Sequence, residues 1–255
     1  PAFNLRIEPS NLSVPQGGVG LLTIYVERKY NFNGEIDIDF EGLPKGFEVS
    51  QTKIEKGLKQ AKIAITAPME APTESLDLKI KGRVGEVSKD ALPVEAMMQA
   101  FYITHLLPTS EFLFDITPAA PFTLRLETVD GGELQLLEDD VVPIKVVVNR
   151  QEGYTEPIQI ARKIMGRGMA FDSITIPGDR SEGLIYVRTP YWDKWSSIQQ
   201  IMVVGTVKAS TNNRVAGLSR NTVISAVSVN SNFIDAKLPE GRPKLTFAEA
   251  RKLIK

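Results

Sequence analysis

The sequence repeats itself once, and this internal repeat constrains the fold more than any other feature of the chain. Residues 3–8 read Phe-Asn-Leu-Arg-Ile-Glu, and residues 122–127 read Phe-Thr-Leu-Arg-Leu-Glu, at an offset of 119 residues. The offset then becomes 122 residues and, near the end of each copy, 123. A register kept over this length predicts two copies of one structural unit. The landmark pairs are Arg28 and Arg150, Ile36 and Ile158, Gly46 and Gly168, Ile54 and Ile176, Ile65 and Val187, Pro68 and Pro190, and Gly82 and Gly205.

Short alternating segments fill both copies. In the first copy, residues 5–8, 22–26, 36–40, 62–65 and 76–80 alternate apolar with polar or small side chains. This alternation predicts β-strands with one buried and one solvated face. Turn-forming sequences such as Pro15-Gln16-Gly17-Gly18 separate the strands. The predicted fold class is therefore all-β, with two tandem antiparallel β-sandwiches of about seven strands each.

The repeat also sets the predicted domain boundaries. We expect a first β-sandwich in residues 1–96, a connector in 97–111, a second β-sandwich in 112–232 and a tail in 233–255. The connector begins Met-Met-Gln-Ala-Phe-Tyr-Ile, which is too apolar for a free, flexible tether. We expect it to be packed, so that the two sandwiches keep a preferred orientation.

The turns resemble those of a known family. The sequence Gly42-Leu43-Pro44-Lys45-Gly46-Phe47 follows one predicted strand, and Ile65-Thr66-Ala67-Pro68 ends another. This order is similar to that of bacterial Ig-like domains, the fibronectin-III-like or NEW3-like sandwiches that occur in tandem in large secreted proteins. The resemblance implies an Ig-like, non-catalytic and extracytoplasmic module. The second copy departs from it at residues 164–168, where the turn has no proline.

Composition excludes most standard active sites. The 255 residues include no cysteine and one histidine, His105, so there is no thiol nucleophile and no cysteine metal site. His105 lies in the connector without a Gly-x-Ser-x-Gly motif elsewhere, which favours a structural role over a catalytic triad. The 30 basic and 31 acidic residues give no electrostatic reason to expect nucleic acid. We predict no enzymatic activity, no catalytic or metal-binding residues, no cofactor and no membrane span.

The two tryptophans of the chain form the candidate ligand site. Tyr191, Trp192 and Trp195 lie in one segment, and the repeat matches it to residues 68–72, where no aromatic residue occurs. Exposed indole rings can stack on sugar rings and donate hydrogen bonds to hydroxyl groups. The alternative is that these rings close one end of the sandwich, because large aromatic side chains more often serve burial.

Two acidic clusters offer oxygen ligands of the kind that calcium prefers. Glu35, Asp37, Asp39 and Glu41 alternate along one predicted strand, and residues 138–140 read Glu-Asp-Asp. Residues two apart on a strand stand about 6.6–7 Å from each other, which is too far for one ion. A solvated strand face is therefore the preferred interpretation of the first cluster.

The tail differs from the rest of the chain. Thr246 to Glu249 matches a capping box, and Phe247, Ala250 and Ile254 share one helical face. We expect a short amphipathic helix over residues 245–255. From residue 235 onward the tail carries six basic and three acidic side chains, so it could contact a partner or lipid headgroups. Docking on its own domain, or the start of a following domain, is the preferred alternative.

These observations favour a non-catalytic tandem Ig-like module. We expect it to be a spacer, adhesion or protein-interaction segment of a larger bacterial protein that is secreted, periplasmic or surface-attached. The first alternative is a carbohydrate-binding module that uses the Trp192 and Trp195 segment, and the second is an accessory domain that docks a neighbouring enzyme domain. The chain opens at Pro1 without an initiator Met, so we expect a parent protein with further domains.

Overall fold

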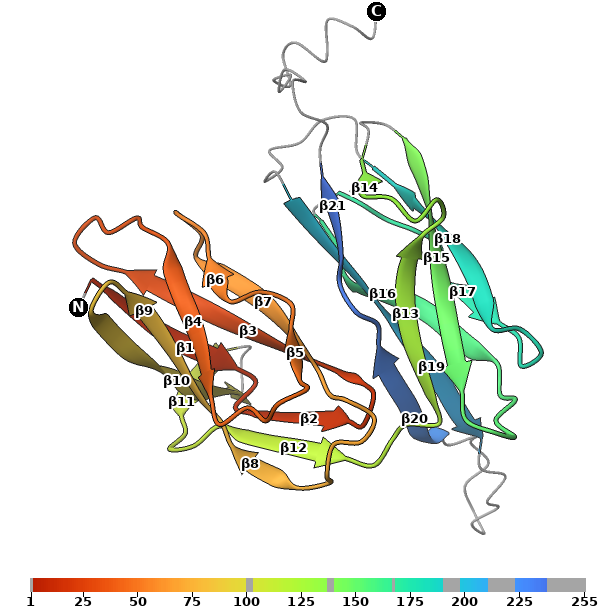
Figure 1. Ribbon diagram of the computed structural model, residues 1–255, viewed down its shortest axis with the longest axis horizontal. Helices are drawn as coiled ribbons and strands as arrows, with labels where there is room; N and C mark the ends of the chain where they lie inside the picture. Colours follow the sequence, from red (N-terminus) through yellow and green to blue (C-terminus); the bar gives the residue numbers. More distant parts are fainter. Residues whose placement is uncertain are drawn as a thin grey trace, which may run out of the picture. The chain divides into compact units, whose positions relative to one another are not determined.

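The chain folds into two compact units of β-strands. The computed structural model describes residues 2–99, 103–136, 140–166, 168–189, 198–210 and 223–237, and these residues contain no helix (Figure 1). Contacts divide the chain into unit 1, Pro1–Ala119, and unit 2, Ala120–Lys255. The prediction of an all-β fold is confirmed for the described part of the chain. The helix expected over residues 245–255 lies outside it.

Unit 1 contains the strands β1 to β12. Their bounds are β1 Phe3–Glu8, β2 Asn11–Pro15, β3 Val19–Arg28, β4 Ile36–Glu41, β5 Glu48–Val49, β6 Lys53–Ile54, β7 Gln60–Thr66, β8 Ser75–Asp77, β9 Lys79–Val84, β10 Val87–Gln99, β11 Ile103–Pro108 and β12 Leu113–Thr117.

Unit 2 contains the strands β13 to β21. Their bounds are β13 Phe122–Thr128, β14 Leu134–Gln135, β15 Val141–Arg150, β16 Ile158–Ile164, β17 Ile174–Ile176, β18 Glu182–Arg188, β19 Ile198–Ser210, β20 Val223–Asn230 and β21 Ile234–Lys237.

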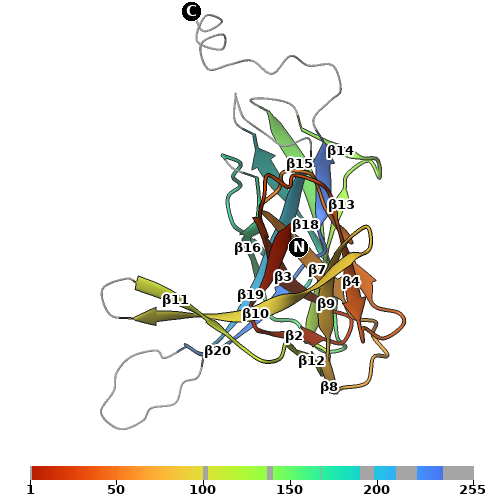
Figure 2. The ribbon, with the colours of Figure 1, turned by 90° about the vertical axis from the view of Figure 1, so that its left-hand side faces the viewer.

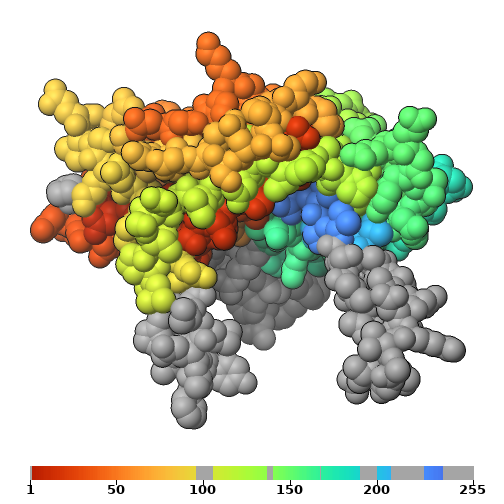
Figure 3. All heavy atoms as spheres, turned by 90° about the horizontal axis from the view of Figure 1, so that it is seen from below, coloured from red at the N-terminus to blue at the C-terminus, as the bar shows by residue number. Residues whose placement is uncertain are grey.

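The strands of unit 1 form two main layers that share one long strand. The order β5-β7-β3-β1 builds one layer and β9-β4-β6 the other. Strand β10 belongs to both, because residues 87–90 pair with β9 and residues 91–93 pair with β1. A third sheet, β2-β12-β8, adds to the same unit, and Figure 3 shows β8 and β12 side by side on its surface.

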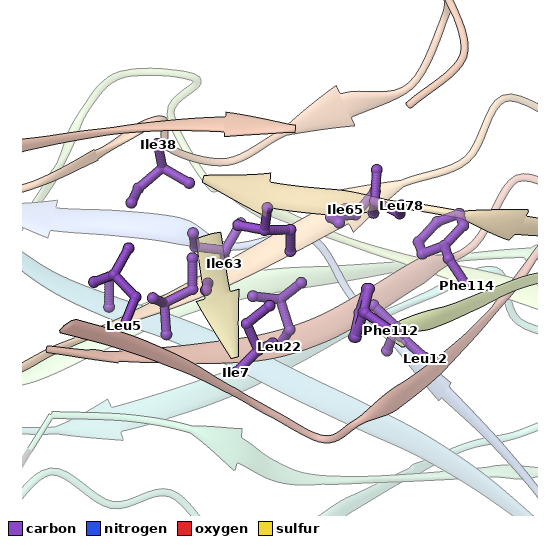
Figure 4. Close-up of a cluster of buried hydrophobic side chains, with 14 of the residues drawn as sticks. Leu5, Ile7, Leu12, Leu22, Ile38, Ile63, Ile65, Leu78, Phe112 and Phe114 are labelled. Atoms are coloured by element: carbon purple, nitrogen blue, oxygen red, sulfur yellow. The ribbon is translucent and has the colours of Figure 1, made fainter. Parts of the chain in front are cut away.

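The core of unit 1 lies between these sheets. Alternate residues of β1, namely Phe3, Leu5 and Ile7, are buried, while the residues between them are half-buried. Figure 4 shows side chains from β1, β3, β4 and β7 meeting in this space, together with Phe112 and Phe114 from the end of the unit. Burial of alternate side chains is what gives each strand its fixed register.

Unit 2 repeats the strand register of unit 1. Phe3 pairs with Arg28, and Phe122 pairs with Arg150. Strand β4 pairs with β6 and with β9, and β16 pairs with β17 and with β19 at the corresponding positions. The offset that the sequence displays is therefore also the offset of the backbone ladders.

A glycine marks the closest approach of the two layers in each unit. A Cβ atom at Gly82 would lie 2.4 Å from Leu5 Cδ1, and one at Gly205 would lie 2.7 Å from Leu124 Cδ1. A larger residue would force the neighbouring leucine or the strand to shift, which favours glycine at this position in both copies.

The turns that carried the family resemblance also need glycine. Gly46 has a φ of 91° and Gly168 a φ of 80°. These values lie in the left-handed region, which side chains other than glycine rarely adopt. The second turn therefore keeps its glycine although its proline is missing.

The boundary between the units differs from the sequence expectation. Strand β12, which we expected at the start of the second sandwich, pairs with β2 and β8 in unit 1. Its inward side chains Phe114 and Ile116, and Phe112 directly before the strand, belong to the unit 1 core. In the same way β21, expected in the tail, pairs with β14 and β19 in unit 2. Unit 1 therefore ends two strands later, and unit 2 one strand later, than the alternation pattern alone suggested.

The expected connector forms a hairpin. Strands β10 and β11 pair in antiparallel register from Val94 opposite Pro108 to Gln99 opposite Ile103. We call residues 94–99 and 103–108 the unit 1 arm. Figure 2 shows the two strands of this arm running together away from the rest of the unit. The hydrophobic segment is thus structured, but as part of unit 1 and not as a link between sandwiches.

Candidate functional site

The aromatic candidate site falls outside the described residues. Tyr191, Trp192 and Trp195 lie between the end of β18 and the start of β19, at positions that the structure does not describe. The side chain of His105 is also outside the described part, although its backbone pairs with Met97 in the unit 1 arm. The sugar-binding role of the aromatic residues stays a prediction.

The alternating acidic residues of β4 have basic partners. Glu35 Oε1 lies 2.7 Å from Lys53 Nζ, and Glu41 Oε2 lies 2.5 Å from Lys81 Nζ. The hydrogen bond from Lys81 lowers the pKa of the Glu41 carboxyl group below its usual value.

The next acidic residue on β4 is paired as well, because Asp39 forms an ion pair with Arg83. Among the residues that the structure describes, no group of three or more His, Asp or Glu side chains could hold a metal ion. The acidic face of β4 is a row of exposed ion pairs.

Arg28 holds two loops of unit 1 together. Its guanidinium donates hydrogen bonds to the carbonyl oxygens of Gly34 at 2.6 Å, Glu55 at 3.1 Å and Leu58 at 3.1 Å. The same group lies 5.3 Å from the ring centre of Phe32. A planar fork of N–H donors suits this bonding, because several carbonyl groups are satisfied by one side chain.

Arg150 does the same work in unit 2. It donates to the carbonyl oxygens of Glu156 at 2.6 Å, Pro177 at 3.0 Å and Arg180 at 3.4 Å. Each acceptor lies 122 residues after the corresponding acceptor of Arg28, although none of the three side chains is the same. The landmark arginines of the sequence are therefore loop-binding residues, and their acceptors are backbone atoms.

Each unit joins an early strand to its last strand in parallel. In unit 1, β2 pairs with β12 over five positions, from Asn11 opposite Leu113 to Pro15 opposite Thr117. In unit 2, β14 pairs with β21 over two positions, Leu134 opposite Ala236 and Gln135 opposite Lys237. The backbone of Gln16 continues the first ladder with a hydrogen bond of 3.0 Å to the carbonyl oxygen of Thr117. The second and the last strand of unit 1 are thus directly bonded.

Unit 2 exposes an apolar patch on the outer face of β15 and β18. We call Val141, Pro143, Leu184 and Tyr186 the unit 2 outer patch. Tyr186 is 55% exposed and Val141 is 52% exposed. Pro143 lies directly opposite Tyr186 in the ladder. Contiguous exposed apolar side chains of this kind are typical of a docking surface.

The side chains at the corresponding positions of unit 1 are less exposed. Ala64 occupies the position of Tyr186 and is 3% exposed, and Val19 occupies the position of Val141 and is 8% exposed. The edge of β7 beside Ala64 is also covered, since β5 pairs with β7 and Ser50 N–H donates to the Ala64 carbonyl oxygen at 2.9 Å.

Our sequence analysis missed the unit 2 outer patch. The signal is present in β18, where Leu184, Ile185, Tyr186 and Val187 are apolar in succession. A strand with one solvated face alternates, so four apolar residues in a row indicate that the outer face is also apolar.

Comparisons with known proteins find similarity to solved structures. No family model matches the sequence, and no curated protein matches it. Among solved structures, domains 5–6 of the S-layer protein SbsC match with 13% identity over 89% of this chain and 96% of that chain, at a TM-score of 0.33. The D0-D1 domain of intimin matches with 9% identity over 92% and 97%, at a TM-score of 0.28.

A third similar structure is that of the fibronectin(III)-like modules of Clostridium thermocellum CbhA, with 10% identity over 95% of this chain and 98% of that chain, at a TM-score of 0.23. All three TM-scores are low, and nothing about the function of this chain follows from them. Within the described residues, no helix is long and apolar enough to cross a membrane.

Proposed function

We propose that the chain is a non-catalytic pair of Ig-like β-sandwich domains that acts as a tension-resisting spacer in a larger secreted or cell-surface bacterial protein. The observation that carries the proposal is the parallel ladder between β2 and β12 in unit 1. The family resemblance of the turn sequences supports the extracytoplasmic location and the presence of further domains in the parent protein.

The resistance of a unit to force depends on the direction in which its strands are pulled. A force on the two ends of unit 1 reaches β2 through β1 at its first residue and β12 at its last residue, so these parallel neighbours are pulled in opposite directions along their length. The hydrogen bonds of the ladder are then loaded together and do not open one after another from a strand end. Such a unit unfolds slowly under load, because forced unfolding depends on the rate of unfolding.

The two units differ in the length of this ladder. Within the described ranges, unit 1 has five paired positions between its second and last strands, and unit 2 has two. We therefore expect unit 2 to yield first and unit 1 to remain folded at a higher force.

Single-molecule pulling on the full chain tests the proposal. Handles attached at the two ends should give two separate unfolding events, with the larger force for unit 1. The later event should release about 400 Å of chain, because unit 1 has 119 residues of at most about 3.6 Å each. Gradual extension of the whole chain at low force, without separate events, would contradict the spacer function.

A carbohydrate-binding role is the second proposal, and one observation favours it. Tyr186 of the outer patch is exposed on β18, the strand that leads into the segment of Trp192 and Trp195. Three or four aromatic rings in succession would make a platform for a sugar chain. Quenching of tryptophan emission by acrylamide, followed by titration with a polysaccharide panel, tests this role, with Trp192→Ala and Trp195→Ala as controls. Emission that acrylamide cannot quench would contradict it.

Docking of a neighbouring domain is the third proposal. It is supported by the unit 2 outer patch, because the equivalent positions of unit 1 are buried at Val19 and Ala64 and half-buried at Leu21 and Lys62.

A further inference from the structure

The unit 1 arm is a two-stranded sheet with an open outer edge. Strand β11 pairs with β10 and with no other strand among the described residues. Two-stranded hairpins are marginally stable in water on their own. An open edge that presents free N–H and C=O groups also invites another strand to pair with it.

The backbone directions on β11 follow from one hydrogen bond at its base. Thr109 N–H donates to the carbonyl oxygen of Pro93 at 3.0 Å, which makes residues 93 and 109 a hydrogen-bonded pair. Direction alternates along an antiparallel ladder, so Leu107 points its N–H and C=O toward β10. Thr104 and Leu106 therefore point theirs to the open edge.

The side chains at the base of the arm are apolar and exposed. Leu106 is 41% exposed, Leu107 is 42% exposed and Leu92 on β10 is 47% exposed. Because Leu106 and Leu107 are neighbours on one strand, they lie on opposite faces of the arm. Both faces thus offer apolar surface to the same incoming partner.

The sequence of the arm carries almost no charge. Residues 94–108 contain one acidic residue, Glu95, and no Lys or Arg. Open edges of natural sheets are normally protected by charged side chains, above all lysine. In unit 2, the sequence between the start of β19 and the end of β20 contains Lys208, Arg214 and Arg220. The unit 1 arm lacks this protection.

We propose that two copies of this chain associate through their unit 1 arms, with β11 of one copy pairing in antiparallel register with β11 of the other. The two-fold register places Thr104 opposite Leu106 of the second copy, which creates four backbone hydrogen bonds. An uncharged edge meets an identical uncharged edge, so no like charges face each other. Pro108 has no N–H and ends the ladder.

A second copy fits this edge better than a lipid surface does. Proteins that lie on anionic membranes use Lys and Arg beside their apolar residues, and the arm has neither. A strand of the same chain satisfies both the free backbone groups and the apolar side chains. The inference concerns an assembly of the chain and does not depend on the spacer function.

The mass of the full chain in solution is the first test. Light scattering after size exclusion, over a dilution series, should give a dimer. Leu106→Pro removes an N–H that points to the open edge and leaves the bonds between β10 and β11 intact, so it should raise the dimer dissociation constant about tenfold or more. Leu184→Pro is the matched control, because Leu184 is also 41% exposed on an edge strand, and it should remain a dimer.

A cross-link tests the register independently of the proline variants. The chain has no cysteine, so His105→Cys introduces a single thiol. In the proposed register, residue 105 of one copy lies opposite residue 105 of the other copy. The two residues form a non-hydrogen-bonded pair with Cα atoms about 4.5 Å apart, a separation that suits a disulfide. Mild oxidation of His105→Cys should yield a covalent dimer on a gel. Tyr186→Cys, treated in the same way, should yield no covalent dimer.

Three results would overturn the proposal. The first is a monomer at all concentrations, and the second is a dimer that survives Leu106→Pro or fails to cross-link at residue 105. The third is a monomer that sediments with neutral phosphatidylcholine vesicles, which would assign the arm to a lipid surface.

Discussion

Arg28 and Arg150 bind the same loops in the two units, whereas the outer faces of the strands beside them differ completely. In unit 1 the face is closed by Ala64, and in unit 2 it is open and carries Tyr186. At the two arginines the units agree in the backbone groups that are bonded, and on this outer face they diverge in the side chains that point to solvent. Backbone bonding is nearly independent of side-chain identity, so it tolerates this divergence.

The segments that follow Gly82 in unit 1 and Gly205 in unit 2 also differ between the units. Gly82 and Phe112 of unit 1 are 30 positions apart, and Gly205 and Ile234 of unit 2 are 29 apart. Unit 1 uses this length for a tight turn at Gly85 and the apolar arm, while unit 2 uses it for one longer pair of strands, β19 and β20. Segments of nearly equal length therefore form an uncharged strand edge in unit 1 and a longer pair of strands with basic residues in its sequence in unit 2.

The largest expected effect tests where unit 1 ends. Phe114 is fully buried in the unit 1 core, so Phe114→Ala should lower the free energy of unfolding of unit 1 by about 3–5 kcal/mol. Calorimetry of the full chain should show the shift in the transition that a fragment of residues 1–119 displays on its own. Leu113→Ala, at a 49% exposed position of the same strand, is the control and should change little. A shift in the unit 2 transition instead would contradict the assignment of β12 to unit 1.

An intermediate effect tests the equivalence of the two arginines. Arg28→Ala and Arg150→Ala should each destabilise their own unit by about 1–3 kcal/mol, because three carbonyl groups lose a charged donor. Lysine at either position should recover only part of the loss, since one ammonium group cannot reach all three acceptors. Urea unfolding with one probe in each unit measures both losses. The two arginines are not equivalent if one alanine variant leaves the stability of its unit unchanged while the other lowers it.

The smallest effect concerns the exposed ion pairs. Hydrogen bonds from Lys81 and Arg188 lower the pKa values of the Glu41 and Asp172 carboxyl groups. A carboxyl group with a lowered folded-state pKa contributes stability above its unfolded pKa and loses it as the pH falls through the folded value. Both units should thus keep their melting temperatures from pH 7 to about pH 5 and lose stability below about pH 4.

Unit 1 should lose more in acid, because the described residues form six ion pairs in unit 1 and four in unit 2. Glu41→Gln should flatten the acid limb of unit 1 slightly and leave unit 2 unchanged. Melting curves at several pH values provide the measurement, and a loss of stability toward alkaline pH would contradict the assigned direction.

The fold was largely predictable because its strands alternate. The repeat of Phe3-Asn4-Leu5 in Phe122-Thr123-Leu124 identified two units, and the structure pairs these segments in the same register. The roles of Arg28 and Arg150 were not predictable, because their acceptors are carbonyl groups in loops that only the fold brings together. The acidic residues of β4 were located correctly on one strand, but their basic partners lie on β6 and β9.

The sequence by itself determined the all-β character of the described chain, the number of repeats and which face of most strands is buried. These properties depend on local periodicity, which is written into neighbouring residues. Only the tertiary structure decided that β12 closes unit 1, that Tyr186 is exposed while Ala64 is buried, and that β11 has an open edge. Each of these depends on a pairing between segments that are distant in sequence, and an alternating pattern is compatible with several partners until the strands pack.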